Sequence, residues 1–413
     1  MTEATEPVEL WRHPSPETTQ MWFFKERVEK KYGVVLKDYR DLYNWSIENI
    51  ADFWRETCLF TGVHAKKAGT SVDASFDQIL DQDAPMFPRP DFFPGTELNF
   101  AQNLLYPRHP QSKEGVQDQD IAIIAATETS RSEVTWAELR KRVGECYNAL
   151  QHQGVKPLDR VAGFVGNHTN AIVAMLAATA LGAIWTAVSP DTGVGAVLDR
   201  LVQIEPVVLF ADNASLYNGK VHETSAKIRE IVASLPKLQA LVVFEEVSAV
   251  KMQENLAGLK PPTGASYTYR ESPKSENPIA QNKFTLFPPS HPAYILYSSG
   301  TTGKPKCIVH SAAGTLIQHK KEHILHCDIR PGDRLFYFTT TTWMMWHWLI
   351  SALASGATLI LYDGSPFVPH GPLTMPKLID ELHITQFGTS AKYLSVLEQK
   401  SCFPKTQTLT LSS

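Results

Sequence analysis

A loop rich in hydroxyl groups and glycine, ending in two lysines, is the segment of this chain best suited to chemistry. It runs from Tyr297 to Lys306 with the sequence YSSGTTGKPK. Glycine lacks the Cβ atom that would keep backbone N–H groups away from an anion. The hydroxyls can turn toward phosphate oxygens or a metal-bound water, and the lysines supply positive charge. This composition therefore indicates a loop that binds polyphosphate.

The spacing of the loop residues separates it from the two common nucleotide-binding motifs. A Walker A loop needs G-x-x-x-x-G-K followed by Ser or Thr, whereas Gly300 and Gly303 stand closer and Pro305 follows the lysine. The dinucleotide fingerprint G-x-G-x-x-G is also absent. Pro305 biases Lys304 toward an extended backbone, which argues against a helix directly after the loop. A flexible surface turn is the alternative for a Ser/Thr/Gly cluster, but ten ordered positions behind an apolar strand favour a ligand-binding loop.

An apolar run, Ala293–Leu296, precedes the loop and predicts a buried strand. From about Asp120 onward such strands alternate with helical patterns, which predicts an α/β fold of mostly parallel sheets covered by helices on both faces. Ligands in such folds bind beyond the carboxyl ends of strands, where this loop lies. The other predicted strands are 121–126, 161–165, 183–188, 207–210, 241–244, 334–340 and 358–362.

Capping signals mark the helices between these strands. Thr135 and Glu138 form a capping box, and the helix that they open should stop at Gly154. Residues 171–188 carry no charge and reach the lower length limit of a membrane-spanning helix, but they are rich in Ala and Thr and have no Lys or Arg anchor nearby. Gly182 divides them into a buried helix and a strand, so we expect no membrane span.

The first quarter of the chain has a different pattern. Residues 16–62 are helical in pattern and rich in aromatic side chains, which predicts helices packed on the main domain. Residues 83–95 are rich in Pro and Phe, as in an irregular connector. We therefore expect an N-terminal helical extension and connector over residues 1–110. Residues 250–290 are polar and carry prolines, which predicts a loop or surface insertion.

The totals exclude several classes of protein. With 413 residues, 43% hydrophobic and 20% charged, the chain is typical of a globular protein. A net charge of −4, without a Lys/Arg run among aromatics, argues against a nucleic-acid partner. Five scattered cysteines without a C-x-x-C pair predict neither a zinc site nor a disulfide framework. The acidic start lacks the apolar region of a secretory signal, and we expect a cytosolic protein with free thiols.

The loop matches the phosphate loop of the adenylate-forming (AMP-binding) acyl-CoA synthetase superfamily. The chain resembles the acetoacetate-activating branch of this superfamily over nearly all of residues 10–400. The resemblance implies an incomplete AMP-binding adenylation domain over residues 111–402, built of stacked, mostly parallel sheets flanked by helices, and a divergent tail over residues 403–413. The closer resemblance is carried by the segments 44–46, 52–54, 185–191 and 339–348.

The resemblance implies a two-step acid-thiol ligase. A carboxylate, here acetoacetate, attacks the α-phosphate of Mg-ATP to give an acyl-adenylate and pyrophosphate, and the thiol of coenzyme A then displaces AMP. Such a displacement needs positioning and charge neutralisation more than a protein nucleophile. The implied cofactors are ATP, Mg²⁺ carried by ATP rather than by a protein metal site, and coenzyme A. The implied role is cytosolic lipid synthesis and ketone-body utilisation.

Within this reaction the loop would hold the β- and γ-phosphates and stabilise the leaving pyrophosphate. For Lys306, a solvated lysine at the loop exit is an equal alternative. The predicted ATP-binding residues are Ser298, Ser299, Gly300, Thr301, Thr302, Gly303, Lys304 and Lys306.

An aromatic run follows the strand at 334–340 and, in the family, lies where the acyl-substrate pocket forms. The predicted substrate residues are Trp343, Trp346 and His347. Tryptophans in such a run are as often plain core, and a satisfied core histidine is the more common role for His347.

The resemblance places one coenzyme A residue, Lys220, where related acetyl-CoA synthetases carry arginines that grip its phosphates. Lysine can meet phosphate as a point charge, but Tyr217 departs from the pattern. Residues 364–367 resemble a family turn near coenzyme A, with Phe367 in place of a polar residue.

Most of the family's remaining catalytic parts, which follow the phosphate loop, have no recognisable counterpart in this sequence. We find no turn for adenine and Mg²⁺, no late ribose-binding acid and no small C-terminal domain with its lysine, so the catalytic residues are unknown. We therefore expect negligible synthetase activity from this chain alone. An acetate- or propionate-activating enzyme is the nearest alternative, and a non-catalytic fragment that binds a nucleotide or a partner is another. A phosphotransferase is disfavoured by the loop spacing.

Overall fold

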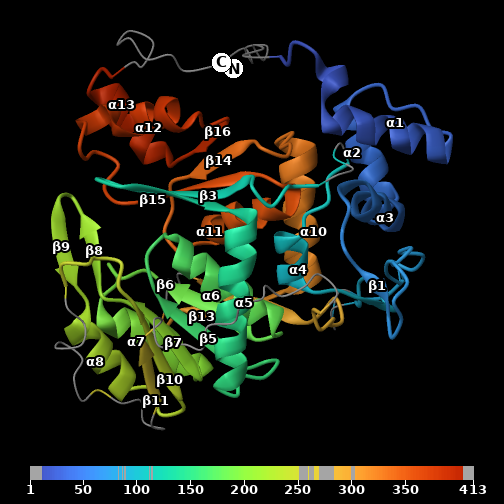
Figure 1. Cartoon of the computed structure of the whole chain (residues 1–413). Helices are drawn as coiled ribbons and strands as arrows, with labels where there is room; N and C mark the ends of the chain where they lie inside the picture. The colour runs from blue at the N-terminus through green and yellow to red at the C-terminus, as the bar shows by residue number, and fades with distance from the viewer. Residues whose placement is uncertain are drawn as a thin grey trace.

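Two large β-sheets with helices around and between them make up most of the molecule, and Figure 1 shows one sheet above the other. The α/β fold with mostly parallel strands is thus confirmed. The computed structural model describes residues 12–402 apart from positions 82, 86, 88–89, 111, 113–114, 251–258, 260–264, 269–282 and 299–302.

The larger sheet has seven strands in the order β11-β10-β7-β5-β6-β12-β13. Neighbours run parallel except for β12 and β13, which are antiparallel. The strands are β5 (Arg160–Phe164), β6 (Ile184–Val188), β7 (Val208–Asp212), β10 (Ala240–Phe244), β11 (Ala265–Thr268), β12 (Pro292–Ser298) and β13 (Lys306–Ser311).

The smaller sheet has five strands in the order β16-β14-β15-β3-β4. Only β3 and β4 pair antiparallel. The strands are β3 (Ile121–Thr127), β4 (Arg131–Thr135), β14 (Arg334–Tyr337), β15 (Thr358–Asp363) and β16 (Gln386–Gly388). Two short antiparallel pairs complete the described strands: β1 (Lys66–Lys67) with β2 (Thr96–Glu97), and β8 (Ala214–Tyr217) with β9 (Lys220–Glu223).

Helix α6 (Thr169–Ala180) lies between the two sheets (Figure 1) and is buried along its whole length except at Asn170. Its alanines let neighbouring elements approach closely, and it belongs to one continuous core with residues of both sheets. Burial on all sides explains why this segment is uncharged. Within the described ranges, none of the helices has the length and apolar character that a membrane crossing requires.

The predicted capping signals are confirmed. The Thr135 hydroxyl accepts from the Glu138 N–H at 3.2 Å and opens α5 (Trp136–His152), and Gly154 follows with φ of 79°. After α6, Gly182 takes φ of 76° and the chain enters β6, as predicted. The other helices of the main domain are α4 (Phe100–Leu105), α7 (Val194–Ile204), α8 (Ser225–Ala233), α10 (Ala312–Lys321), α11 (Met344–Ser351), α12 (Thr374–Leu382) and α13 (Ala391–Gln399).

The N-terminal segment forms three helices, α1 (Gln20–Tyr32), α2 (Tyr39–Glu48) and α3 (Ile50–Thr61), in agreement with the helical pattern of residues 16–62. Their apolar side chains pack on Ile324 and Leu325, which follow α10. Glu56 is fully buried and forms ion pairs with Arg27 and Lys31. The extension is therefore packed on the main domain (Figure 1).

Among the strands that the sequence did not predict, four antiparallel ones are β4, β8, β9 and β13. Each is part of a hairpin whose partially exposed residues lack the long apolar run that marks a buried parallel strand. The strand predicted at 334–340 ends at Tyr337, because the chain leaves β14 to cross the ends of other strands. Most of the predicted insertion at 250–290 lies outside the described residues.

Candidate functional site

The phosphate loop connects β12 to β13 as a hairpin, here called the phosphate hairpin (residues 298–306). Ser298 pairs with Lys306, and Tyr297 pairs with Cys307, in the antiparallel register. A strand rather than a helix follows Pro305, as its backbone restriction predicted. Of the predicted ATP-binding residues, Ser298, Gly303, Lys304 and Lys306 are described, whereas Ser299, Gly300, Thr301 and Thr302 lie outside the described residues.

The described part of the phosphate hairpin has an exposed ammonium group. The Lys304 side chain is 77% exposed, and its Nζ lies 3.9 Å from Asp199 Oδ1 on α7, so the ammonium is only loosely paired. Lys306 is also exposed, and its N–H donates to the Ser298 hydroxyl at 3.4 Å. Both lysines can therefore turn toward an anion without breaking a buried contact.

Side chains of neighbouring elements contact the base of the phosphate hairpin. Gln203 on α7 donates from Nε2 to the Pro305 carbonyl at 2.8 Å. The Tyr297 hydroxyl lies 3.2 Å from the Thr186 hydroxyl of β6, and burial raises the pKa of Tyr297. The Arg200 guanidinium lies 5.7 Å from the centre of the same ring. The hairpin thus leaves the sheet from a rigid base.

A cluster of charged side chains lies where the carboxyl ends of both sheets meet. His168 Nε2 donates to Asp212 Oδ1 at 2.9 Å, and His168 Nδ1 lies 3.3 Å from Glu246 Oε1. Asp212 Oδ2 accepts from the Gly166 N–H at 2.6 Å. Asp363, at the end of β15, approaches so closely that a Cβ on Gly166 would lie 2.4 Å from its Oδ2. The cluster therefore joins β5, β7 and β10 to the smaller sheet.

The charges of this cluster are set by burial and by one another. Burial disfavours the imidazolium, but the carboxylates of Asp212 and Glu246 raise the pKa of His168 to about 10. Burial, reinforced by Asp212, raises the pKa of Asp363 to about 6 although His168 opposes the shift. At neutral pH the cluster holds an imidazolium among carboxylates, so it is suited to linking the sheets rather than to binding phosphate.

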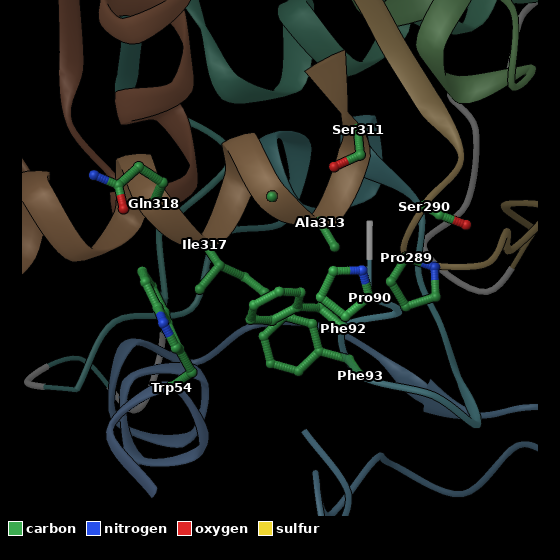
Figure 2. Close-up of a pocket in the computed structure, with 11 residues that line it drawn as sticks. Trp54, Pro90, Phe92, Phe93, Pro289, Ser290, Ser311, Ala313, Ile317 and Gln318 are labelled. Atoms are coloured by element: carbon green, nitrogen blue, oxygen red, sulfur yellow. The ribbon is translucent and has the colours of Figure 1, made fainter. Parts of the chain in front are cut away.

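Beside this cluster is a polar cavity of about 470 Å³ between β3, α6 and the β8–β9 hairpin. Hydroxyl, amide and charged side chains line it, among them Arg142, His168 and Asp363. A second cavity, of about 240 Å³, is mostly apolar and lies between α3 and α10, beside the start of β12 and the end of β13. Figure 2 shows Trp54, Phe92 and Phe93 gathered around it.

The structure separates the three predicted substrate residues. The Trp343 side chain is 59% exposed in front of α11, whereas Trp346 and His347 are fully buried. Trp346 donates from Nε1 to Asn167 Oδ1 at 3.0 Å. His347 packs on Tyr294, and burial lowers the pKa of the imidazole to about 3, so it is neutral. Trp343 is therefore the member that can touch a ligand directly, and the other two lie behind it.

The segment before Trp343 crosses the carboxyl ends of the larger sheet. The Thr341 hydroxyl donates to the Val165 carbonyl at 2.7 Å, and the Thr342 hydroxyl accepts from the Ser189 N–H at 2.9 Å. These contacts hold the start of α11 over β5 and β6. The segment that leads to Trp343, which follows β14 of the smaller sheet, therefore crosses strand ends of the larger sheet next to β12, from which the phosphate hairpin leaves.

The two segments predicted for coenzyme A come together around a residue that the sequence did not indicate. Lys220 and Tyr217 are exposed and face each other across the β8–β9 hairpin. The carboxylate of Glu128, in the turn between β3 and β4, accepts from the backbone of that hairpin and from Ser365. No motif marks Glu128, because its partners are far away in the sequence.

Comparison with known proteins agrees with this architecture. The family model described as AMP-binding enzyme matches residues 112–412, and the model described as acetyl-coenzyme A synthetase N-terminus matches residues 39–104. The chain belongs to the AMP-binding enzyme family. The AMP-binding match extends over most of residues 403–413, for which a divergent tail was predicted, and the N-terminal match lies within residues 1–110.

Relatives in the AMP-binding enzyme family are similar along nearly the whole chain. The malonamoyl-CoA synthetase of Penicillium aethiopicum is 50% identical over 97% of this chain, and the acetoacetyl-CoA synthetase of Danio rerio is 42% identical over 97%. The solved structure of acetoacetyl-CoA synthetase from Streptomyces lividans superposes with a TM-score of 0.83 at 33% identity, over 97% of this chain. These matches cover 55%, 57% and 58% of the respective relatives, so the chain spans little more than half their length.

Among the described residues, no group of three or more His, Cys, Asp or Glu side chains is arranged to hold a metal ion. The expectation that Mg²⁺ enters with ATP stays a prediction. All five cysteines are free.

Proposed function

We propose that this chain contributes the phosphate-binding part of an acid-thiol ligase that activates a short carboxylic acid with Mg-ATP and transfers it to coenzyme A. The observation that carries the proposal is the phosphate hairpin. It leaves the strand end with an exposed Lys304, in a chain of the AMP-binding enzyme family. Four more of the predicted phosphate ligands in this hairpin lie outside the described residues.

The proposed chemistry uses the phosphate hairpin to neutralise charge. Lys304, with the backbone N–H groups and hydroxyls of the loop, holds the β- and γ-phosphates. The acid's carboxylate oxygen attacks the α-phosphorus, the bond to the bridging oxygen breaks, and pyrophosphate leaves. Lys304 stabilises the negative charge that collects on pyrophosphate, so its effect is greatest as the bond breaks. The thiol of coenzyme A then attacks the acyl carbon and releases AMP.

The names of the relatives narrow the proposed acid. In acetoacetate and malonamate a methylene group separates the carboxylate from a second carbonyl group. The two acids differ only in the substituent on that second carbonyl, which is methyl in acetoacetate and amino in malonamate. We therefore propose a short 3-oxo acid, with acetoacetate as the first candidate. The exposed Trp343 ring would contact its small terminal group, while Trp346 and His347 support Trp343 from the core.

The test uses this chain and two measurements. Calorimetric binding of Mg-ATP reports on the phosphate hairpin, and ATP–pyrophosphate exchange with acetoacetate, malonamate, acetate or propionate reports on adenylate formation. We expect Mg-ATP binding, and any exchange to be fastest with the two 3-oxo acids. Binding without exchange would support the non-catalytic, nucleotide-binding alternative. Faster exchange with acetate or propionate would instead support the acetyl- or propionyl-CoA synthetase alternative, and no Mg-ATP binding would contradict the proposal.

We also propose that the protein works in the cytosol and supplies acyl-CoA for lipid synthesis from ketone bodies. Five free thiols suit a reducing compartment. Fractionation of cells that express the chain, with detection by antibody, checks the location.

A further inference from the structure

Glu128 is a buried carboxylate whose partners are three backbone N–H groups. Its side chain is nearly inaccessible, with a residue exposure of 5%. Oε1 accepts from Asn218 at 2.6 Å and from Ser365 at 2.8 Å, and Oε2 accepts from Gly219 at 2.7 Å. No ion pair to Glu128 occurs in the described part of the chain, so its carboxylate is held there by charge-assisted hydrogen bonds from backbone groups. We call this group the Glu128 clamp.

The backbone at both ends of the Glu128 clamp is shaped for this contact. Asn218 and Gly219 form the two-residue turn of the β8–β9 hairpin with φ of 53° and 71°, the left-handed pair that a tight hairpin turn requires. Gly364 has φ of 157°, and a Cβ there would lie 2.7 Å from Glu128 Cγ. The turn at 364–365 thus approaches Glu128 at a distance that only glycine allows.

The Glu128 clamp joins the smaller sheet to the tip of the β8–β9 hairpin. Glu128 follows β3 of the smaller sheet, whereas the β8–β9 hairpin follows β7 of the larger sheet. Figure 1 shows this hairpin standing at the side of the molecule, next to the turn after β3. The tip of the hairpin is exposed, with Tyr217 at 51%, so side-chain packing contributes little there. The backbone bonds to Glu128 therefore fix the tip.

We propose that Glu128 is a positioning residue, which fixes the Lys220 hairpin beside the 364–365 turn and thereby sets the affinity for the phosphate groups of coenzyme A. Lys220 follows Gly219 directly, so any rotation of the turn moves its ammonium. A lysine meets phosphate as a point charge, and its contribution depends on where its Cα is held. The coenzyme A part of this inference rests on the proposed function, whereas the clamp itself does not.

The experiment compares wild type with Glu128→Gln and with the matched control Glu133→Gln, an exposed glutamate of the adjacent strand β4. Glutamine keeps the shape but loses the charge, and its amide nitrogen cannot accept the Gly219 N–H. Hydrogen exchange followed by mass spectrometry should show about ten-fold faster exchange in the peptides that contain 218–219 and 365 in Glu128→Gln, and no change in Glu133→Gln. Unchanged exchange in Glu128→Gln would overturn the clamp.

Equilibrium binding of coenzyme A then tests the positioning role. We expect about ten-fold weaker binding in Glu128→Gln, unchanged Mg-ATP binding, and little further loss when Glu128→Gln is added to Lys220→Ala. Additive losses, or faster exchange with unchanged affinity, would overturn the positioning of Lys220. If wild type binds no coenzyme A, the coenzyme A half of the proposed function fails, and the exchange data alone decide the clamp.

Discussion

Two hairpins with exposed lysines present the candidate ligand-binding groups of this protein, and they are held in place in different ways. The phosphate hairpin grows out of paired strands of the larger sheet, so its base is fixed by the backbone register of β12 with β13. The β8–β9 hairpin forms a small sheet of its own, and its tip depends on one carboxylate about 90 residues away in the sequence. The phosphate hairpin is held by strands close to it in the sequence, and it carries a recognisable sequence motif. The β8–β9 hairpin depends on a single distant contact, which leaves no pattern in the sequence.

The largest expected effect concerns the free-energy cost of a buried charge held by backbone groups. Lys320 is the opposite-sign counterpart of Glu128, because it is fully buried and donates from Nζ to the carbonyls of Arg108 and Ala354 at 3.0 and 2.8 Å. Burial, with a smaller contribution from Arg108, lowers the pKa of Lys320 to about 7. Two backbone carbonyls thus do not fully offset the cost of burying the ammonium.

The sign of the pH dependence follows from this lowered pKa. Between pH 7 and about 10.5 the unfolded chain binds a proton at Lys320 that the folded chain does not, so the free energy of unfolding rises with pH. We expect wild type to gain up to about 5 kcal/mol relative to Lys320→Met over this range, and the difference to be constant below pH 7. Denaturant unfolding of both proteins from pH 6 to 10 measures it. A pH-independent difference would show that Lys320 keeps its ordinary pKa.

The second prediction probes the phosphate hairpin. Lys304→Met should weaken Mg-ATP binding by about 10- to 100-fold, the range for losing a charge-assisted contact, without changing the melting temperature because the side chain is exposed. Lys306→Met serves as the comparison and should cost about three-fold or less. Calorimetry measures the Mg-ATP affinity of both variants. Equal losses of affinity would show that Lys306 contributes as much to phosphate binding as Lys304.

The third prediction tests the Glu128 clamp from its other side. Gly364→Ala would place a Cβ 2.7 Å from Glu128 Cγ and should push the carboxylate away from Ser365. We expect a loss of about 1–3 kcal/mol in the free energy of unfolding and weaker coenzyme A binding, with Mg-ATP binding unaffected. Gly303→Ala is the control for stability, since nothing lies within 4 Å of a Cβ there. Unchanged stability and unchanged coenzyme A binding in Gly364→Ala would contradict the prediction, because they would show that the turn at 364–365 can move away from Glu128 without cost.

The smallest expected effect concerns the base of the phosphate hairpin. Gln203→Ala removes the 2.8 Å bond to the Pro305 carbonyl at an exposed site. Because the register of β12 with β13 already fixes the base, we expect a change of about two-fold or less in Mg-ATP affinity. A loss above ten-fold would show that this hairpin too relies on a side-chain contact, and the contrast with β8–β9 would disappear.

Much of the fold was predictable because its signals are local. The capping box at Thr135, the glycine after α6 and the apolar run before the loop each act within a few residues, and each prediction is confirmed. The hairpin strands β4, β8, β9 and β13 were missed because they are partly exposed and lack a continuous apolar run. The sequence could not tell which tryptophans of the run 343–348 are core residues. Only the tertiary structure shows that Trp343 is exposed and Trp346 is buried.

The candidate site divides in the same way. Asp212 and Asp363 each end an apolar strand, and a polar residue in that position could have been noticed. That they meet His168 and Glu246 in one cluster depends on how the two sheets stack, which no single segment specifies. The position of the Lys220 side chain could not be predicted from the sequence either, because it depends on the contact between its hairpin and Glu128.

By itself the sequence determined the family, the α/β class and the phosphate loop, because periodicity, capping and loop composition are properties of neighbouring residues. Only the tertiary structure decided which carboxylates gather between the sheets, which tryptophan is exposed and what holds the β8–β9 hairpin. Those outcomes depend on packing α6 between two sheets, which brings distant strand ends together and takes their charges out of water.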